Sequence, residues 1–229
     1  MSWSCLDIQN GLESKERYQN FQGFIGGICA ASPVKYSDGL MGYIDRSFQF
    51  IVDPTYESCH DLSCGRLVAY DKKTECWHVL SSAGNKLFEL QHKVVEHYCE
   101  GLAAVSNEFT SYGFVDFSGK LVIEYKYEYV SSFSEGLCFC CEKGKVGYID
   151  SRGEYVIPPQ YCGGSRFSGG RAVVSKDQDT DIVVDNAGNE LFEMKSGGMR
   201  QVSLGVIMTR NSGLNTYYNQ NFECIWFDR

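Results

Sequence analysis

Cysteine and histidine are the residues of this 229-residue chain whose side chains are best suited to binding a metal or attacking a substrate. Two groups bring them together: Cys59-His60 with Cys64, and His97-Tyr98-Cys99. A zinc site of the finger type needs two ligand pairs at short, defined spacings, and neither group has a second pair at such a spacing. We therefore expect buried thiols and incidental histidines at both places, with no bound metal.

Acidic side chains suggest two further kinds of site. The segment Asp177–Asp181 alternates carboxylates in the manner of a Ca²⁺ loop, but such a loop also needs Gly at its sixth position and Glu at its twelfth. The chain has Ile182 and Gly188 there, so we expect a solvated hairpin tip. A set of recurring aspartates shares one turn position and is expected to be structural: Asp7, Asp45, Asp116, Asp150 and Asp185.

The sequence contains none of the common catalytic motifs. It has no Gly-x-Ser-x-Gly elbow, no phosphate-binding glycine loop and no His-Glu-x-x-His pair. The four histidines fall at different strand positions in different parts of the chain, so we expect no catalytic constellation. We expect a protein that is not an enzyme and uses no cofactor. A site assembled across several repeats stays open as the alternative.

A repeat of 33 to 38 residues determines where all these residues lie. Two markers keep step along the chain, which identifies tandem copies of one unit. The first marker is a turn position, found at Asn10, Phe48, Gly84, Gly119, Gly153, Gly188 and Asn221. The second is a glycine three residues after a large apolar residue, found at Gly27, Gly65, Gly101, Gly136, Gly170 and Gly205.

Each repeat contains three strand-like runs, of which Leu137–Cys140, Gly147–Asp150 and Tyr155–Ile157 are one set. The links are too short for helices, so the runs should pair as an antiparallel meander. The turn after the second run has a physical cause. An aspartate accepts a backbone N–H two residues on, and glycine at the fourth position adopts positive φ at little cost. Phe48 at that position predicts a remodelled turn in the first full copy.

The pattern predicts an all-β protein of tandem three-stranded antiparallel repeats, with six units after an N-terminal partial one. We expect a single domain over residues 1–229. Its units are 1–23 (partial), 24–61, 62–97, 98–132, 133–166, 167–201 and 202–229. Aromatic residues such as Tyr161 and Phe167 recur between units and should wedge one unit against the next. Repeats of this kind close into a β-propeller-like ring, which we prefer, or stack into an open β-solenoid array.

Composition limits the class of partner and the compartment. The net charge of −8 argues against nucleic acid or an anionic membrane as partner. Residues 1–20 lack the features of a signal peptide, and no apolar run is long enough to span a bilayer. Eleven cysteines, an odd number, lie mostly inside expected strands, which indicates buried thiols in a reducing compartment. We expect a monomer that is either cytoplasmic, which we prefer, or exported by a route that needs no cleaved N-terminal signal.

The order Phe133-x-x-Gly136-Leu137, Gly147-Tyr148-Ile149-Asp150-x-x-Gly153 and Ile157-Pro158-x-x-Tyr161 resembles the WG-repeat family, a bacterial β-repeat. The resemblance is best over residues 98–167. The Trp-Gly pair that names the family is not intact: Ser4 follows Trp3, His78 follows Trp77, and other residues precede the glycines. The resemblance implies tandem β-hairpin units, and it implies neither an enzymatic activity nor a defined site.

The hairpin tips between the first and second runs differ most among the copies. Variable loops on a rigid scaffold are where binding is usually found. We therefore expect a protein–protein interaction scaffold of unknown partner, and the residues expected to bind are Tyr36, Asp38, Tyr112, Asp177, Asp179 and Arg210. The alternative is a module that binds a glycan or small molecule with aromatic residues between units.

Overall fold

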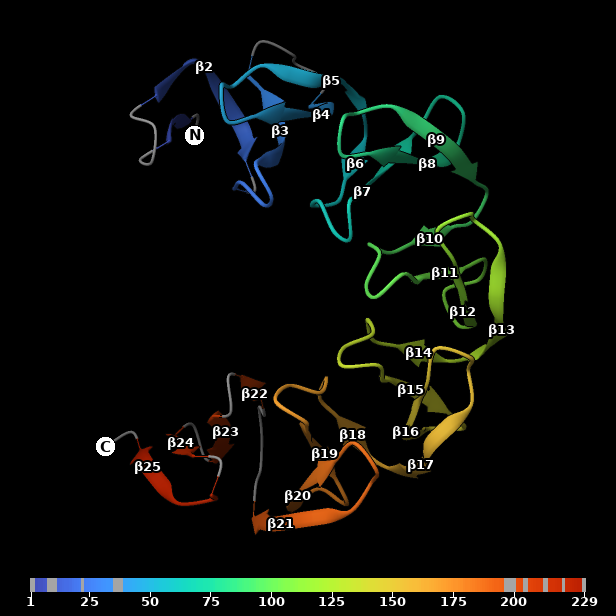
Figure 1. The fold of residues 1–229 in the computed structure, drawn as a ribbon, viewed down its shortest axis with the longest axis vertical. Coiled ribbons are helices and arrows are strands. Elements are labelled where there is room, and N and C mark those ends of the chain that lie inside the picture. The colour runs from blue at the N-terminus through green and yellow to red at the C-terminus, as the bar shows by residue number, and fades with distance from the viewer. Residues whose placement is uncertain are drawn as a thin grey trace. The chain divides into compact units, whose positions relative to one another are not determined.

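The structure is a computed structural model, and it describes residues 3–7, 12–21, 23–34, 39–195, 201–203, 206–211, 214–219 and 221–227. Within these ranges the chain contains strands and turns and no helix, so the predicted all-β class is confirmed. The described part of the chain consequently offers no helix that could cross a membrane. The strands form antiparallel sheets in which chain neighbours pair (Figure 1).

The chain divides into two compact parts, residues 1–107 with 115–120, and residues 108–114 with 121–229. The first sheet has the order β1 (Trp3–Asp7), β2 (Leu12–Phe21), β3 (Ile28–Pro33), β4 (Met41–Asp45), β5 (Phe50–Tyr56). The second has the order β6 (Ser58–Cys59), β7 (Arg66–Asp71), β8 (Cys76–Ser81), β9 (Lys86–Leu90). The third has the order β10 (Val94–Val95), β11 (Ala103–Ser106), β12 (Tyr112–Val115), β13 (Leu121–Tyr127).

The remaining three sheets repeat the same plan. The fourth has the order β14 (Tyr129–Val130), β15 (Cys138–Glu142), β16 (Lys145–Ile149), β17 (Tyr155–Tyr161). The fifth has the order β18 (Gly163–Gly164), β19 (Arg171–Ser175), β20 (Thr180–Asp185), β21 (Glu190–Lys195). The sixth has the order β22 (Gln201–Ser203), β23 (Val206–Asn211), β24 (Leu214–Tyr218), β25 (Cys224–Phe227).

Most sheets contain one strand more than the three that the sequence pattern predicts. The additional strand comes first and is very short: β6, β10, β14 and β18 are two residues each. Two residues carry no readable alternation of polar and apolar side chains, which explains why the pattern misses them. The predicted N-terminal partial unit forms no sheet of its own, because β1 and β2 belong to the sheet of β3, β4 and β5.

In the copies where it is described, the second marker glycine has a structural role, which is to close the turn that leads into β3, β7, β11, β15 or β19. Ser63 and Arg66 exchange two backbone hydrogen bonds across Cys64 and Gly65, whose φ angles are 50° and 73°. Two successive residues with positive φ define the type I′ turn, which prefers glycine at its second position. The same pair of hydrogen bonds recurs before β15, between Ser134 and Leu137.

The aspartate turns form as the sequence predicts. In the turn after β16, Asp150 Oδ1 accepts the backbone N–H of Arg152 at 2.9 Å and of Glu154 at 3.0 Å. Equivalent bonds reach Asp45, Asp116 and Asp185. Asp7 lies at the end of β1, and its side chain lies outside the described residues. The recurring aspartates are therefore structural where they are described.

Two predictions about these turns are wrong. The turn of the first full copy is not remodelled: Phe48 adopts a φ of 58°, and its N–H donates to Asp45 O as glycine does elsewhere. In the last copy the marker position is Phe222, with a φ of 63°, and not Asn221. The N–H of Phe222 donates to Asn219 O, so Asn219 takes the role of the turn aspartate.

Aromatic side chains pack one sheet against the next inside each part, as predicted. In the second part the ring of Phe167 meets Tyr148 at 5.0 Å, and Phe133 meets Phe114 at 5.0 Å. The Tyr148 hydroxyl also donates to Ser165 O at 2.8 Å. All four rings are buried, so they form the core between sheets. Cys29, Cys138 and Cys140 are buried thiols that form no disulfide with the described residues, in agreement with the sequence interpretation.

Candidate functional site

The structure places the predicted binding residues in different surroundings. Asp177 and Asp179 are exposed in the tip between β19 and β20, where Asp177 Oδ1 accepts the N–H of Asp179 at 2.9 Å. Tyr112 is half-buried and begins β12. Tyr36 and Asp38 lie outside the described residues. Arg210 belongs to β23, and its side chain lies outside the described residues.

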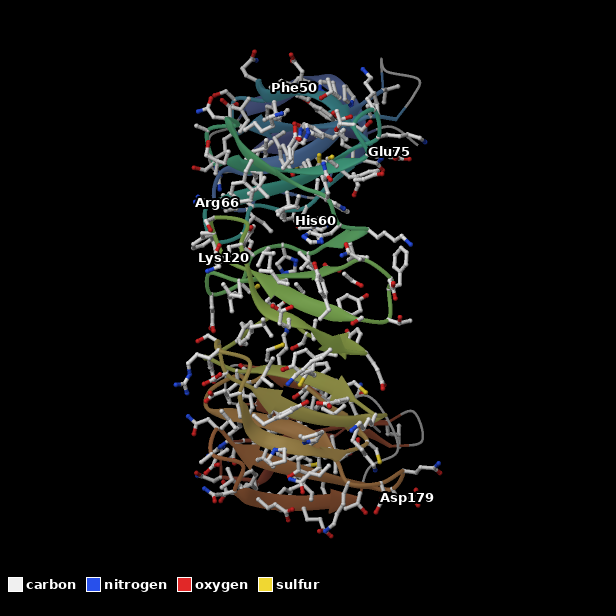
Figure 2. All side chains as sticks on the ribbon, turned by 90° about the vertical axis from the view of Figure 1, so that its right-hand side faces the viewer. Phe50, His60, Arg66, Glu75, Lys120 and Asp179 are labelled. Carbon is white, nitrogen blue, oxygen red and sulfur yellow. The ribbon has the colours of Figure 1, made fainter. Side chains whose placement is uncertain are left out.

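The tips carry exposed apolar side chains that the sequence interpretation missed. Phe109, between β11 and β12, has 61% of its surface exposed and a φ of 61°. Val34 follows β3 and Leu214 begins β24, and both are exposed. The tip between β7 and β8 contains Glu75, which directly precedes β8. Figure 2 shows Glu75 at the opposite end of this sheet from Arg66, the first residue of β7. The missed signal was an isolated aromatic residue inside a polar loop.

The Asp177–Asp181 segment, expected to be a solvated hairpin tip, has carboxylates in two kinds of surroundings. Asp181 is fully buried in β20 and accepts a hydrogen bond from the Ser175 hydroxyl at 3.2 Å. Asp177 is occupied by the turn bond to Asp179. Asp177 and Asp179 lie in an exposed tip as expected, whereas the expectation of a solvated carboxylate is wrong for Asp181.

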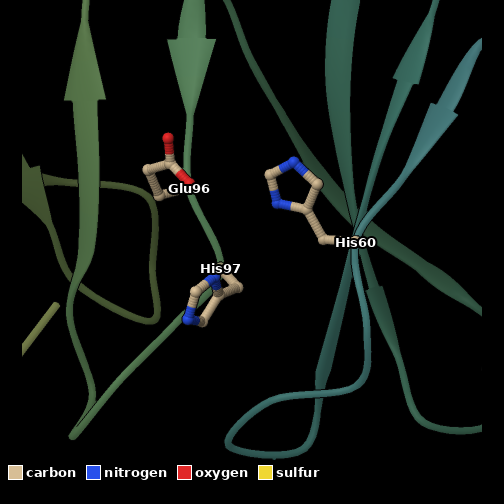
Figure 3. Close-up of side chains that lie close together, drawn as sticks. All are labelled: His60, Glu96 and His97. Carbon is tan, nitrogen blue, oxygen red and sulfur yellow. The ribbon is translucent and has the colours of Figure 1, made fainter. Parts of the chain in front are cut away.

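The prediction that the histidines lie apart is wrong for two of them. His60, which follows β6, and His97, which follows β10, face one another with Glu96 in the first part of the chain (Figure 3). One ligand atom from each of the three side chains lies within 4.8 Å of the other two. Two imidazoles and a carboxylate in this arrangement can bind a cation or exchange protons.

The repeat itself explains why these side chains meet. The N–H of His60 donates to Val68 O at 2.8 Å, and the N–H of Glu96 donates to Ala104 O at 2.9 Å, so the two residues occupy equivalent positions in successive sheets. Both lie five residues before a marker glycine. A comparison of the copies at that position would have found the pair, because the later copies have Ser131 and Ser165 there.

In those later copies the serine serves the backbone. The Ser131 hydroxyl accepts the N–H of Phe139 at 3.2 Å, and the Ser165 hydroxyl accepts the N–H of Val173 at 3.0 Å. A histidine or glutamate at the same position has a longer side chain that extends away from this bond. The copies that contain His60 and Glu96, in the second and third sheets, therefore have a group capable of chemistry where the later copies have a structural serine.

Hydrogen bonds hold both sides of the cluster in place. The Tyr43 hydroxyl donates to His60 O at 2.9 Å, and the Ser63 hydroxyl donates to Tyr98 O. Tyr98 is fully buried, and its hydroxyl donates to Asp116 O at 3.2 Å. The backbone that carries His60 and His97 is thus fixed by buried neighbours.

The cluster lines a cavity of about 500 Å³ that also includes Cys59, Asp61 and Leu62. Burial lowers the pKa of His60 below its usual value, with the carboxylate of Glu96 acting against it and His97 acting with it. His60 is therefore held as the neutral imidazole. Burial raises the pKa of the neighbouring Cys59 thiol to about 12, so this thiol stays protonated at neutral pH.

Comparison with known proteins identifies the repeat. The family model described as "WG containing repeat" matches residues 41–70, 112–145 and 147–178, which confirms the resemblance seen in the sequence. The matched stretches begin at Met41-Gly42, Tyr112-Gly113 and Gly147. No curated protein matches the chain.

Solved structures with similar folds include Hsv2 of Kluyveromyces lactis, at a TM-score of 0.57 and 11% identity over 84% of this chain and 70% of that one. The C-terminal WD40 domain of Sif2 matches at a TM-score of 0.52 and 8% identity over 91% of this chain and 68% of that one. At such identities the likeness shows the fold alone. The sheets are therefore β-propeller-like, since four-stranded antiparallel units repeat in such folds.

Proposed function

We propose that this chain, which carries WG-type repeats on a WD40-like fold, is a non-enzymatic scaffold that binds a protein partner through its hairpin tips. Phe109 is the observation that carries the proposal. Its ring is the most exposed large apolar side chain among the described residues. The positive φ of Phe109 disfavours a bulky side chain, and an exposed aromatic ring is the kind of side chain that anchors protein interfaces.

Two properties of the tips support this role. Their ends are set by regular strands, so an anchor on a tip is held by a rigid base. Aromatic anchors surrounded by polar residues are the usual source of binding energy at protein interfaces. Phe109 has Glu108 and Thr110 as neighbours, which supply such polar surroundings.

The alternative of a glycan or small molecule bound between units has less support. That function needs aromatic faces open to a ligand. Tyr148, Phe133 and Phe167, which lie between successive sheets, are buried against one another or against further core residues. Their packing leaves the interaction scaffold as the better-supported function.

The test is quantitative affinity enrichment from cells, with the wild-type chain compared with the Phe109→Ser variant. We expect a specific partner to be enriched by the wild type and to fall by about tenfold or more with the variant, because a central aromatic anchor contributes roughly 2 kcal/mol. The matched control is Val156→Ser, which removes an exposed apolar side chain from β17 and not from a tip.

Equal enrichment by the wild type and Phe109→Ser, with both proteins folded by circular dichroism, would exclude this tip as the binding site. A partner lost with Val156→Ser and retained by Phe109→Ser would show that the surface of the sheets, and not the tips, makes the contact.

A further inference from the structure

We propose that His60, Glu96 and His97 form a binding site for a divalent transition-metal ion, with Zn²⁺ as the preferred ion. The three side chains come from two successive sheets and converge on one point (Figure 3). The site is independent of the hairpin tips and of the proposed partner. Its function is to bind the ion and, through it, to cross-link the chain segments that follow β6 and β10.

The donor set selects the class of ion. Two imidazole nitrogens with one carboxylate oxygen are typical of three-ligand zinc sites, which keep the fourth position open. Hard ions such as Mg²⁺ and Ca²⁺ prefer sites made only of oxygen. Ligands around a tetrahedral zinc ion lie roughly 3.3 Å apart when each bond is about 2.0 to 2.1 Å long. The three ligand atoms lie within 4.8 Å of one another. Rotation of the side chains would bring them to the shorter separation that a bound ion requires.

A second observation points to a ligand at this place. His60 Nδ1 is buried and has no hydrogen-bond partner among the described residues. A buried polar atom without a partner is destabilising by about 1–3 kcal/mol, and coordination to a metal removes that cost. The backbone of His60 is meanwhile fixed by the Tyr43 hydroxyl, which donates to His60 O at 2.9 Å. The imidazole is therefore positioned before any ion arrives.

The cavity of about 500 Å³ beside the cluster leaves room for a fourth ligand. Water or a small anion from solvent can occupy that position, since Glu96 is exposed at the rim and gives the ion a path to the site. The site therefore differs from a closed structural zinc site, in which protein atoms fill all four positions. We expect binding that is readily reversed by a chelator.

The experiment measures binding of Zn²⁺ to the full chain after treatment with a chelator. Isothermal titration should give one ion per chain for the wild type. Glu96→Gln and His97→Gln preserve side-chain size at positions that are not fully buried, and each should weaken binding by at least about tenfold. Thermal unfolding followed with and without Zn²⁺ should show a rise in Tm for the wild type and none for either variant.

Two control variants separate this site from other ligands in the same part of the chain. His92→Gln alters a histidine whose ring meets Asn107 at 3.0 Å, and Cys64→Ser removes an exposed thiol. Both should bind Zn²⁺ as the wild type does. Co²⁺ in place of Zn²⁺ should give visible absorption without the near-ultraviolet band of a thiolate–metal bond.

Three results would overturn the proposal. The first is a folded wild-type chain that binds no Zn²⁺ at micromolar concentrations. The second is unchanged affinity in both Glu96→Gln and His97→Gln, which would show an ion held elsewhere. The third is loss of binding in Cys64→Ser, which would assign the ion to thiols. Circular dichroism of each metal-free variant establishes that lost binding is not lost folding.

Discussion

Phenylalanine at a left-handed turn position is the residue-scale feature that departs most from expectation. Phe48 and Phe222 adopt φ angles of 58° and 63°, which disfavour a bulky side chain. Each ring has a compensating contact: Phe48 lies 5.8 Å from Phe24, and Phe222 stacks on Phe192 at 4.9 Å. Ring pairs contribute about 0.5–1.5 kcal/mol beyond area burial. Packing therefore offsets the backbone cost that made us predict a remodelled turn.

The turn aspartates predict a pH dependence at the same scale. The pKa of Asp185 is below its usual value because the Asn189 side chain donates a hydrogen bond to it, followed by the backbone N–H groups of Asn189, Ala187 and Gly188. A lowered pKa in the folded state means that the unfolded chain binds more protons near pH 4. Stability from this carboxylate is therefore present above the unfolded pKa and lost as pH falls through the folded pKa.

The measurement is the urea midpoint of the wild type and of Asp185→Asn between pH 6 and pH 3. The amide of the variant still accepts turn hydrogen bonds and does not titrate, so its midpoint should fall less on acidification. Asp179→Asn, in an exposed hairpin tip, is the control and should follow the wild type. If the urea midpoint of Asp185→Asn fell on acidification as much as that of the wild type, the acid sensitivity would not come from Asp185.

At the scale of the element, glycine in the next-to-last strand of three sheets, at Gly42, Gly113 and Gly147, has a steric cause. A Cβ atom on Gly42 or Gly147 would lie 2.3 Å from Val52 O or 2.5 Å from Ile157 O, which are backbone atoms of the next strand. In these two copies the next strand, β5 or β17, is seven residues long. Its pairing with the glycine-containing strand shifts register at two points. Where His78 replaces the glycine, the register shifts only once. The glycine therefore permits the bulge.

Gly147→Ala should consequently destabilise the fold by about 3 kcal/mol, at the upper end of the range for overpacking, because Ile157, Pro158 and Pro159 meet the new methyl with backbone atoms. Chemical denaturation measures the change. Gly136→Ala is the comparison, since its Cβ would meet nothing within 4 Å and only its φ of 80° opposes the substitution. We expect a cost of about 1–2 kcal/mol there. A smaller loss for Gly147→Ala than for Gly136→Ala would be inconsistent with the steric explanation.

The arrangement of the two parts belongs to the scale of the whole molecule, and there the closed ring stays a prediction. Repeated four-stranded antiparallel sheets are the units from which β-propellers are built, and this is the reason for preferring the ring to the open array. A closed chain of this length should have a radius of gyration of about 17 Å, the value for compact proteins. Small-angle X-ray scattering measures this radius. A clearly larger radius, with a maximum dimension that exceeds any compact form, would favour the open array.

The sequence predicted those features that depend on local contacts. The repeat period, the long strands and the aspartate turns follow from residues a few positions apart. The two-residue strands were missed because they carry no pattern of their own. The cluster of His60, Glu96 and His97 was missed because it depends on contact between successive sheets, 36 or 37 residues apart along the chain. Phe109 was missed because exposure of one loop residue is a tertiary property.

The equivalent hydrogen-bonded position five residues before each marker glycine has a consequence for protein engineering. His60 and Glu96 occupy it in two sheets, and Ser131 and Ser165 occupy it in two others with the same backbone bond. At this position the repeat brings the side chains of His60 and Glu96 from successive sheets close together. Ser131→His, Ser165→Glu and Arg166→His would reproduce the three-residue set in the second part of the chain. The repeat thus provides the same attachment point several times, and the residue placed at each can be chosen independently.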